Sequence, residues 1–184
     1  MTQALVVVDI QNDYFPGGAH PLQGPEAAAE HARRLLDAFR GTGRPVFHMQ
    51  HVWDEPDALY MRPGTPGIEI NGSVAPDGDE PVIQKTFPNS FLQTDLEARL
   101  REQGIEQLLV CGMMTSMCVD ATVRAAVDLG FSTSVAHDAC ATCDLEFGGS
   151  TIPAASVHGA FLAALADGYA EVKPTGDLVA GLGG

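Results

Sequence analysis

The sequence is poor in positive charge. Only 10 of its 184 residues are lysine or arginine, against 24 aspartates and glutamates, and the formal net charge is −14 with neutral histidines. A surface with this balance repels phosphate backbones and anionic headgroups, so we expect no nucleic-acid partner and no membrane partner. The charge is compatible with a neutral or cationic small molecule, and it also favours plain solubility.

Long apolar runs and secretory features are missing as well. No apolar run approaches the roughly 20 residues that a transmembrane helix needs. Residues 1–3 lead straight into an apolar segment, without the basic stretch and cleavage pattern of a signal peptide. We therefore expect a cytoplasmic protein whose four cysteines are reduced thiols.

Apolar segments alternate along the chain with helical patterns. The helices are expected at 26–40, 94–103, 116–129 and 153–166, and the strands at 4–8, 45–49, 82–85, 107–111, 131–137 and 169–172. Alternation of this kind is typical of βαβ units. It predicts a three-layer α/β/α fold around a doubly wound, six-stranded, mostly parallel sheet.

One domain is expected over residues 1–184, with its core at about 4–173. The glycine-rich tail, 175–184, is predicted to fray. Residues 51–78 hold four prolines and no clear periodicity. A loop of that length in a small domain is usually functional, so this one is expected to act as a lid or as part of an interface.

Three reactive side chains follow predicted strands: Asp9, Lys85 and Cys118. Carboxyl ends of parallel strands share one edge of the sheet, where such folds bind ligands. In the first turn of helix 116–129, the thiol of Cys118 is expected to have a lowered pKa. The lysine would stabilise the thiolate, and the aspartate could exchange a proton with the leaving amine. Singly, each residue fits a turn, a surface charge or the core; together they predict a nucleophilic site.

Sequence motifs surround all three residues. They are Val8-Asp9-Ile10-Gln11-Asn12-Asp13, Gln84-Lys85, Asn89-Ser90-Phe91, Thr94-Asp95-Leu96, Gly112-Met113-Met114-Thr115-Ser116-Met117-Cys118-Val119 and Asp138-Ala139-Cys140. In this order and spacing, the chain resembles the isochorismatase-like cysteine hydrolase superfamily, over about residues 4–173. That superfamily includes nicotinamidases, N-carbamoylsarcosine amidohydrolases and streptothricin hydrolase.

The resemblance implies a catalytic triad of Asp9, Lys85 and Cys118, and a cis peptide bond between Met113 and Met114. The backbone N–H groups of Met114 and Cys118 would then form an oxyanion hole. The implied activity is cleavage of a C–N bond in a small amide, carbamoyl or ureido substrate through a thioester. The resemblance also implies a homodimer or a higher homo-oligomer, and no organic or redox cofactor.

A metal site is the main alternative to weigh. Nicotinamidases of this superfamily bind a metal through an Asp-x-His pair and a further histidine after the second strand. Residues 48–54 read His-Met-Gln-His-Val-Trp-Asp and lack that pair. His48 and His51, three apart on a strand, point to opposite faces, so no metal is expected; they would converge only if the strand ended at Gln50. Cys140 and Cys143 form a lone C-x-x-C pair, which indicates packing more than zinc.

The substrate-binding candidates are Gln11, Phe15, Trp53, Phe87 and Met114, which follow strand ends in loops above the sheet edge. Three other functions stay open at this stage. They are a nicotinamidase with a metal in the pocket, an isochorismatase-type ether hydrolase, and a catalytically idle binding module of the same fold. The ether hydrolases of the superfamily lack the cysteine, so Cys118 argues against the second.

Overall fold

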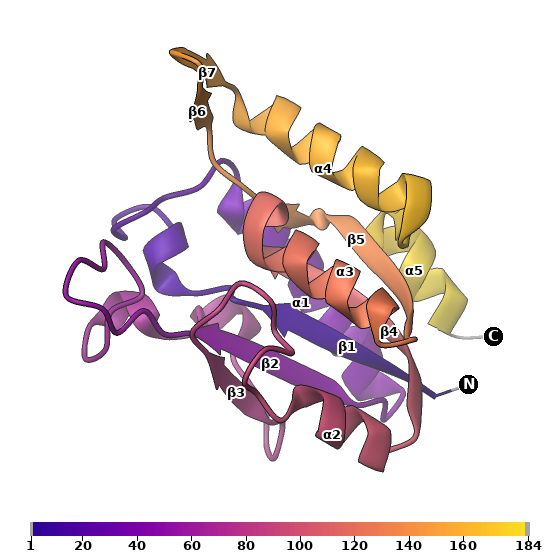
Figure 1. Cartoon of the computed structure of the whole chain (residues 1–184). Coiled ribbons are helices and arrows are strands. Elements are labelled where there is room, and N and C mark those ends of the chain that lie inside the picture. The colour runs from indigo at the N-terminus through magenta and orange to yellow at the C-terminus, as the bar shows by residue number, and fades with distance from the viewer. Residues whose placement is uncertain (1, 183–184) are drawn as a thin grey trace.

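Six parallel strands form the central sheet of the computed structural model, which describes residues 2–182 (Figure 1). Their order is β3-β2-β1-β4-β5-β8, and every neighbouring pair is parallel. The strands are β1 (Thr2–Val8), β2 (Val46–His51), β3 (Val82–Lys85), β4 (Ile105–Met113), β5 (Ser132–Ala141) and β8 (Glu171–Lys173). The strand order reverses between β1 and β4, which is where open α/β sheets bind ligands.

Helices cover both faces of this sheet, which confirms the predicted three-layer α/β fold (Figure 1). They are α1 (Pro25–Gly41), α2 (Leu96–Glu102), α3 (Asp120–Asp128), α4 (Ala154–Gly168) and α5 (Thr175–Leu182). In β1, Leu5 and Val7 pack on the side of α1 and α5, whereas Val6 and Val8 pack on the side of α2, α3 and α4. Burial on both faces explains why β1 is apolar throughout.

The tail differs from the prediction. Residues 175–182 form α5, and Leu178 and Leu182, four residues apart, are buried with α1. The start of α5 is fixed by Asp138, whose Oδ1 accepts hydrogen bonds from the Thr175 backbone N–H at 2.8 Å and hydroxyl at 2.7 Å. The fraying prediction is therefore wrong over this range, because one buried helix face outweighs the glycine content. Residues 183 and 184 lie outside the described residues.

A hairpin was also not expected from the sequence. Strands β6 (Leu145–Phe147) and β7 (Ser150–Ile152) pair antiparallel and extend away from the sheet (Figure 1). Gly148 and Gly149 join them with φ angles of +59° and +78°. A two-residue hairpin turn of type I′ requires a positive φ at both central residues, which glycine adopts easily.

The loop between β2 and β3 is held by short 3-10 helices at Pro66–Ile68 and Gly72–Val74. A third 3-10 helix, Asn12–Tyr14, follows β1. These turns bring two loops together above the carboxyl edge of the sheet, since Asn12 N–H bonds to the Glu69 carbonyl at 3.0 Å. Within residues 2–182, no helix is both long and apolar enough to cross a bilayer.

Candidate active site

Asp9, Lys85 and Cys118 meet at the carboxyl edge of the sheet. Lys85 Nζ lies 2.6 Å from Asp9 Oδ2, and both side chains are fully buried. Cys118 Sγ, a carboxylate oxygen of Asp9 and a ring nitrogen of His51 all lie within 4.8 Å of one another. The structure thus brings together the three residues that the sequence pattern selected, although they come from three separate strand ends.

The backbone that carries the thiol has an unusual path. Gly112 has φ +135°, and a side chain there would collide with the Val8 carbonyl, so only glycine lets β4 pass so close to β1. The Met113–Met114 peptide bond is cis. Residues Thr115–Val119 then form one π-helical turn, in which Val119 N–H bonds to the Met114 carbonyl at 3.1 Å. Such turns are frequent at functional sites.

Cys118 lies inside this turn, because the regular helix α3 begins only at Asp120. Burial raises the pKa of the Cys118 thiol, and the Asp9 carboxylate raises it further, while Lys85 opposes both. The prediction of a lowered thiol pKa is therefore wrong. Burial and the nearby Asp9 carboxylate raise the thiol pKa by more than the helix N-terminus can lower it. The resting group is therefore a thiol, with Asp9 as the adjacent base.

Lys85 keeps its proton. Burial lowers the pKa of its ammonium, but the charge of Asp9 and the proximity of Cys118 outweigh burial and raise the pKa overall. The ammonium therefore neutralises the buried carboxylate over the physiological pH range.

The raised thiol pKa gives a direct test. At pH 7.5, iodoacetamide should alkylate Cys118 at least about tenfold more slowly than a free cysteine, because each unit of pKa lowers the thiolate fraction tenfold. The rate should keep rising with pH beyond pH 9. Asp9→Asn should accelerate labelling, since it removes a charge that raises the thiol pKa and leaves Lys85 in place. The measurement is peptide mapping by mass spectrometry; a rate that levels off below pH 8 would instead indicate a resting thiolate.

A cavity of about 230 Å³ opens above the thiol. It is mostly apolar, as small-molecule sites usually are, and it is lined by Tyr14, His51, Trp53, Tyr60, Thr86, Pro88, Met114, Met117 and Cys118. Trp53 and Met114, two of the predicted substrate-binding residues, are among these. The Trp53 and Tyr60 rings meet edge to face with centroids 5.3 Å apart, which makes one wall of the cavity aromatic.

The other three predicted substrate-binding residues lie elsewhere. Gln11 is fully buried and pins two loops: its Oε1 accepts from His51 N–H at 2.8 Å, and its Nε2 donates to the Ile68 carbonyl at 2.7 Å. Phe87 is more than a third exposed, and only its carbonyl takes part in the site, by accepting from Lys85 Nζ at 3.0 Å. Phe15 lines a neighbouring cavity.

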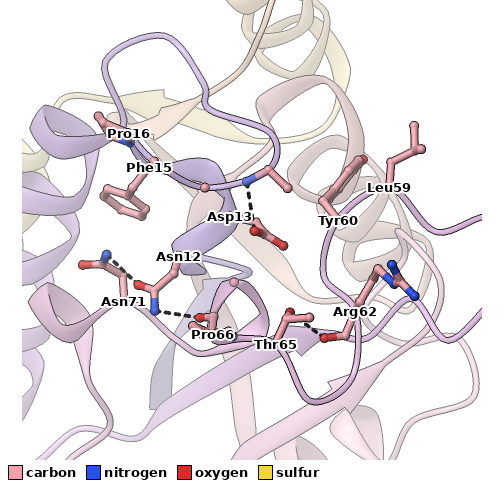
Figure 2. Close-up of a pocket in the computed structure, with 14 residues that line it drawn as sticks. Asn12, Asp13, Phe15, Pro16, Leu59, Tyr60, Arg62, Thr65, Pro66 and Asn71 are labelled. Atoms are coloured by element: carbon pink, nitrogen blue, oxygen red, sulfur yellow. Dashed lines mark hydrogen bonds between the residues drawn. The ribbon is translucent and has the colours of Figure 1, made fainter.

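That neighbouring cavity, of about 740 Å³, is the outer cavity (Figure 2). Its walls include Phe15, Leu59, Tyr60 and Arg62. Asp13 also lines this cavity, and both of its carboxylate oxygens accept backbone hydrogen bonds: Oδ1 from Ala19 N–H at 3.0 Å and Oδ2 from Met61 N–H at 2.6 Å. Tyr60 lines both cavities, so the outer cavity adjoins the space above the thiol at this residue.

The two histidines of β2 do not converge. The strand continues through His51, and His48 Nε2 lies 2.8 Å from Glu80 Oε2, away from the triad. Among residues 2–182, Asp9, His51 and Cys118 are the group with metal-ligand spacing. However, Lys85 Nζ contacts both Asp9 Oδ2 at 2.6 Å and His51 Nδ1 at 3.2 Å. The ammonium already contacts both of these donors and would repel a second cation there, so the residues present do not fit a metal cation.

Sequence reasoning missed Tyr14 as part of the cavity, and weighed His51 only as a metal ligand. Tyr14 could have been found, because it follows Asp9 closely in a short turn. Burial raises its pKa well above the usual value, so its phenol stays protonated. Tyr60 reaches the site through the folding of the loop between β2 and β3, for which the sequence carries no local signal.

A doubly wound parallel sheet with a buried thiol, carboxylate and ammonium at its switch point defines an α/β protein of the cysteine hydrolase class. Residues 3–170 match the family model described as the isochorismatase domain. The chain belongs to the isochorismatase family and is a hydrolase of that family.

Individual relatives agree with this placement. The chain is 53% identical to an uncharacterized isochorismatase family protein, YddQ, of Bacillus subtilis strain 168, over 95% of this chain and 97% of the relative. It is 39% identical to a streptothricin hydrolase of Streptomyces noursei, over 94% of this chain but only 62% of the relative. A crystal structure assigned as an isochorismatase hydrolase from Oleispira antarctica superposes with a TM-score of 0.93 at 48% identity, covering 97% and 96% of the two chains.

Proposed function

We propose that the protein hydrolyses a C–N bond of a small amide, carbamoyl or ureido compound through a thioester on Cys118, without a metal. The observation that carries this proposal is the placement of the Asp9 carboxylate beside both the Lys85 ammonium and the Cys118 thiol, under a mostly apolar cavity. The similarity to a streptothricin hydrolase supports a hydrolytic function.

The first half-reaction forms the thioester. Asp9 takes the thiol proton as Cys118 Sγ attacks the substrate carbonyl carbon, and it then gives that proton to the departing nitrogen as the C–N bond breaks. In the second half-reaction, Asp9 takes a proton from water, the hydroxide attacks the thioester, and the carboxylic acid leaves while the thiol is restored. The backbone N–H groups of Met114 and Cys118 would bind the oxyanion in both steps.

Lys85 supports this cycle without exchanging protons. Its ammonium lies 2.6 Å from Asp9 Oδ2 in a fully buried pair, so it offsets the charge of the carboxylate and holds that group beside the thiol. The high pKa of the thiol is consistent with this cycle, because the proton moves to Asp9 only as the sulfur attacks.

The test is a release assay for ammonia or amine with nicotinamide, carbamoyl amino acids, biuret and lactams. We expect turnover of at least one compound of this panel and unchanged turnover after treatment with a chelator. Cys118→Ala is the matched inactive control. Loss of activity on chelation would instead favour a metal-dependent nicotinamidase, and binding without turnover across the panel would favour an idle binding module.

A further inference from the structure

His51, the last residue of β2, connects the catalytic lysine to the cavity. Lys85 Nζ has three N–H groups, and its neighbours include Asp9 Oδ2 at 2.6 Å, the Phe87 carbonyl at 3.0 Å and His51 Nδ1 at 3.2 Å. An ammonium has no lone pair and can only donate. His51 Nδ1 must therefore be the acceptor.

This contact decides the tautomer of the ring. If Nδ1 accepts, the proton of the neutral imidazole is on Nε2. Burial lowers the pKa of His51, and the Lys85 ammonium lowers it further against the opposing effect of Asp9, so the ring is neutral at physiological pH. The titratable groups around it are Lys85, Asp9, Cys118, Tyr14 and Tyr60.

The Nε2–H group is unused. His51 lines the cavity above the thiol, and within residues 2–182 its Nε2 has no hydrogen-bond partner, although the backbone N–H, the backbone carbonyl and Nδ1 of the same residue are all bonded. One of its ring nitrogens lies within 4.8 Å of Cys118 Sγ, so the ring borders the space that a substrate of the thiol would occupy.

We propose that His51 is a substrate-binding residue that donates its Nε2–H to a second acceptor atom flanking the scissile carbonyl. The inference rests on the proposed function and narrows it to amides that carry a further carbonyl or carboxylate oxygen close to the reacting carbonyl, as biuret and N-carbamoyl amino acids do. A simple amide without that oxygen would leave this N–H without a partner on the substrate.

Two substitutions separate this role from simple support of Lys85. In His51→Asn, the side-chain oxygen can replace Nδ1 as the acceptor for Lys85, but no donor reaches into the cavity. In His51→Gln, the amide N–H can replace Nε2–H, but the contact with Lys85 is lost. We expect His51→Asn to raise KM about tenfold for biuret and carbamoyl amino acids with little change in kcat, the effect typical of one lost hydrogen bond. His51→Gln should keep KM within about threefold and lose kcat instead.

The reverse pattern, with a normal KM in His51→Asn and a raised one in His51→Gln, would overturn the proposal and leave His51 as a positioning residue for Lys85. For acetamide, which lacks the second acceptor, the two variants should have equal KM values. The rate at which iodoacetamide alkylates Cys118 in each variant, compared with the wild-type rate, shows whether the environment of the thiol is intact.

A measurement without turnover keeps this inference separable from the proposed function. In Cys118→Ala, ¹⁵N spectra of the histidine rings should show His51 as the Nε2–H tautomer, and biuret or N-carbamoylglycine should shift that resonance, whereas acetamide should not. A shift in Cys118→Ala together with an inactive wild-type protein would refute the hydrolase proposal and keep the binding role. An Nδ1–H tautomer, or bound biuret without a shift, would refute the binding role.

Discussion

Replacing Cys118 by alanine should lower kcat for any amide substrate by about 10,000-fold or more, since the covalent route needs the sulfur. The loss should come with little change in fold, because the side chain keeps its Cβ and vacates only the volume of one sulfur atom next to an existing cavity. The wild-type protein mixed with substrate and quenched rapidly should carry the acyl group on Cys118, detectable by mass spectrometry.

The matched control is Cys140→Ala, which removes another buried thiol, one that bonds to backbone groups of Ala136 and Gly112 and takes no part in the triad. It should leave kcat within a few-fold of the wild type. Turnover that survives in Cys118→Ala would refute the nucleophile, whereas equal losses in both variants would point to general disruption of the sheet.

Lys85→Met should destabilise the protein by about 3–5 kcal/mol, the usual cost of leaving one member of a buried ion pair without its partner. Both side chains are fully buried, so water cannot take over the role of the ammonium. The same substitution should abolish activity, because it removes the cation that contacts the Asp9 carboxylate at 2.6 Å and holds the base beside the thiol. Urea denaturation at constant pH measures the first effect and the release assay the second.

The double variant Asp9→Asn/Lys85→Met separates the two effects. It removes both charges, so it should recover part of the lost unfolding free energy while staying inactive. If the double variant is as unstable as the sum of the two single variants, the ion pair is not the source of the cost, and the loss would have to be assigned to packing around residue 85.

Much of the site followed from the sequence because its chemistry is attached to strand ends. Asp9 directly follows β1, Lys85 is the last residue of β3 and Cys118 lies in the turn after β4, and parallel topology brings those strand ends to one edge. The layered fold followed from the same alternation of strands and helices. Local pattern and topology together were sufficient for this level of description.

The remainder depends on long-range packing. The cavity walls come from loops that are connected by hydrogen bonds from Gln11 and Asp13 to backbone groups far along the chain. No local sequence pattern predicts these long-range hydrogen bonds. The thiol pKa was predicted with the wrong sign, since burial and the distance to Asp9 exist only in the folded chain. Helix α5 was not predicted because the glycine content of this segment indicated a loop, although Leu178 and Leu182 lie on one helix face.

The position of β1 has a consequence for the order in which the protein is made. In β1, Leu5 pairs with Val46 of β2 on one side and with Leu109 of β4 on the other. The pairing of β1, the first strand synthesised, is therefore complete only after β4 has been synthesised. Because chains emerge from the ribosome N-terminus first, Asp9 and Lys85 can associate before Cys118 has left the tunnel. The nucleophile is the last member of the triad to be synthesised, and it meets its base only when β4 pairs with β1. A nascent chain that ends before Cys118 thus carries no complete triad and should have no hydrolytic activity.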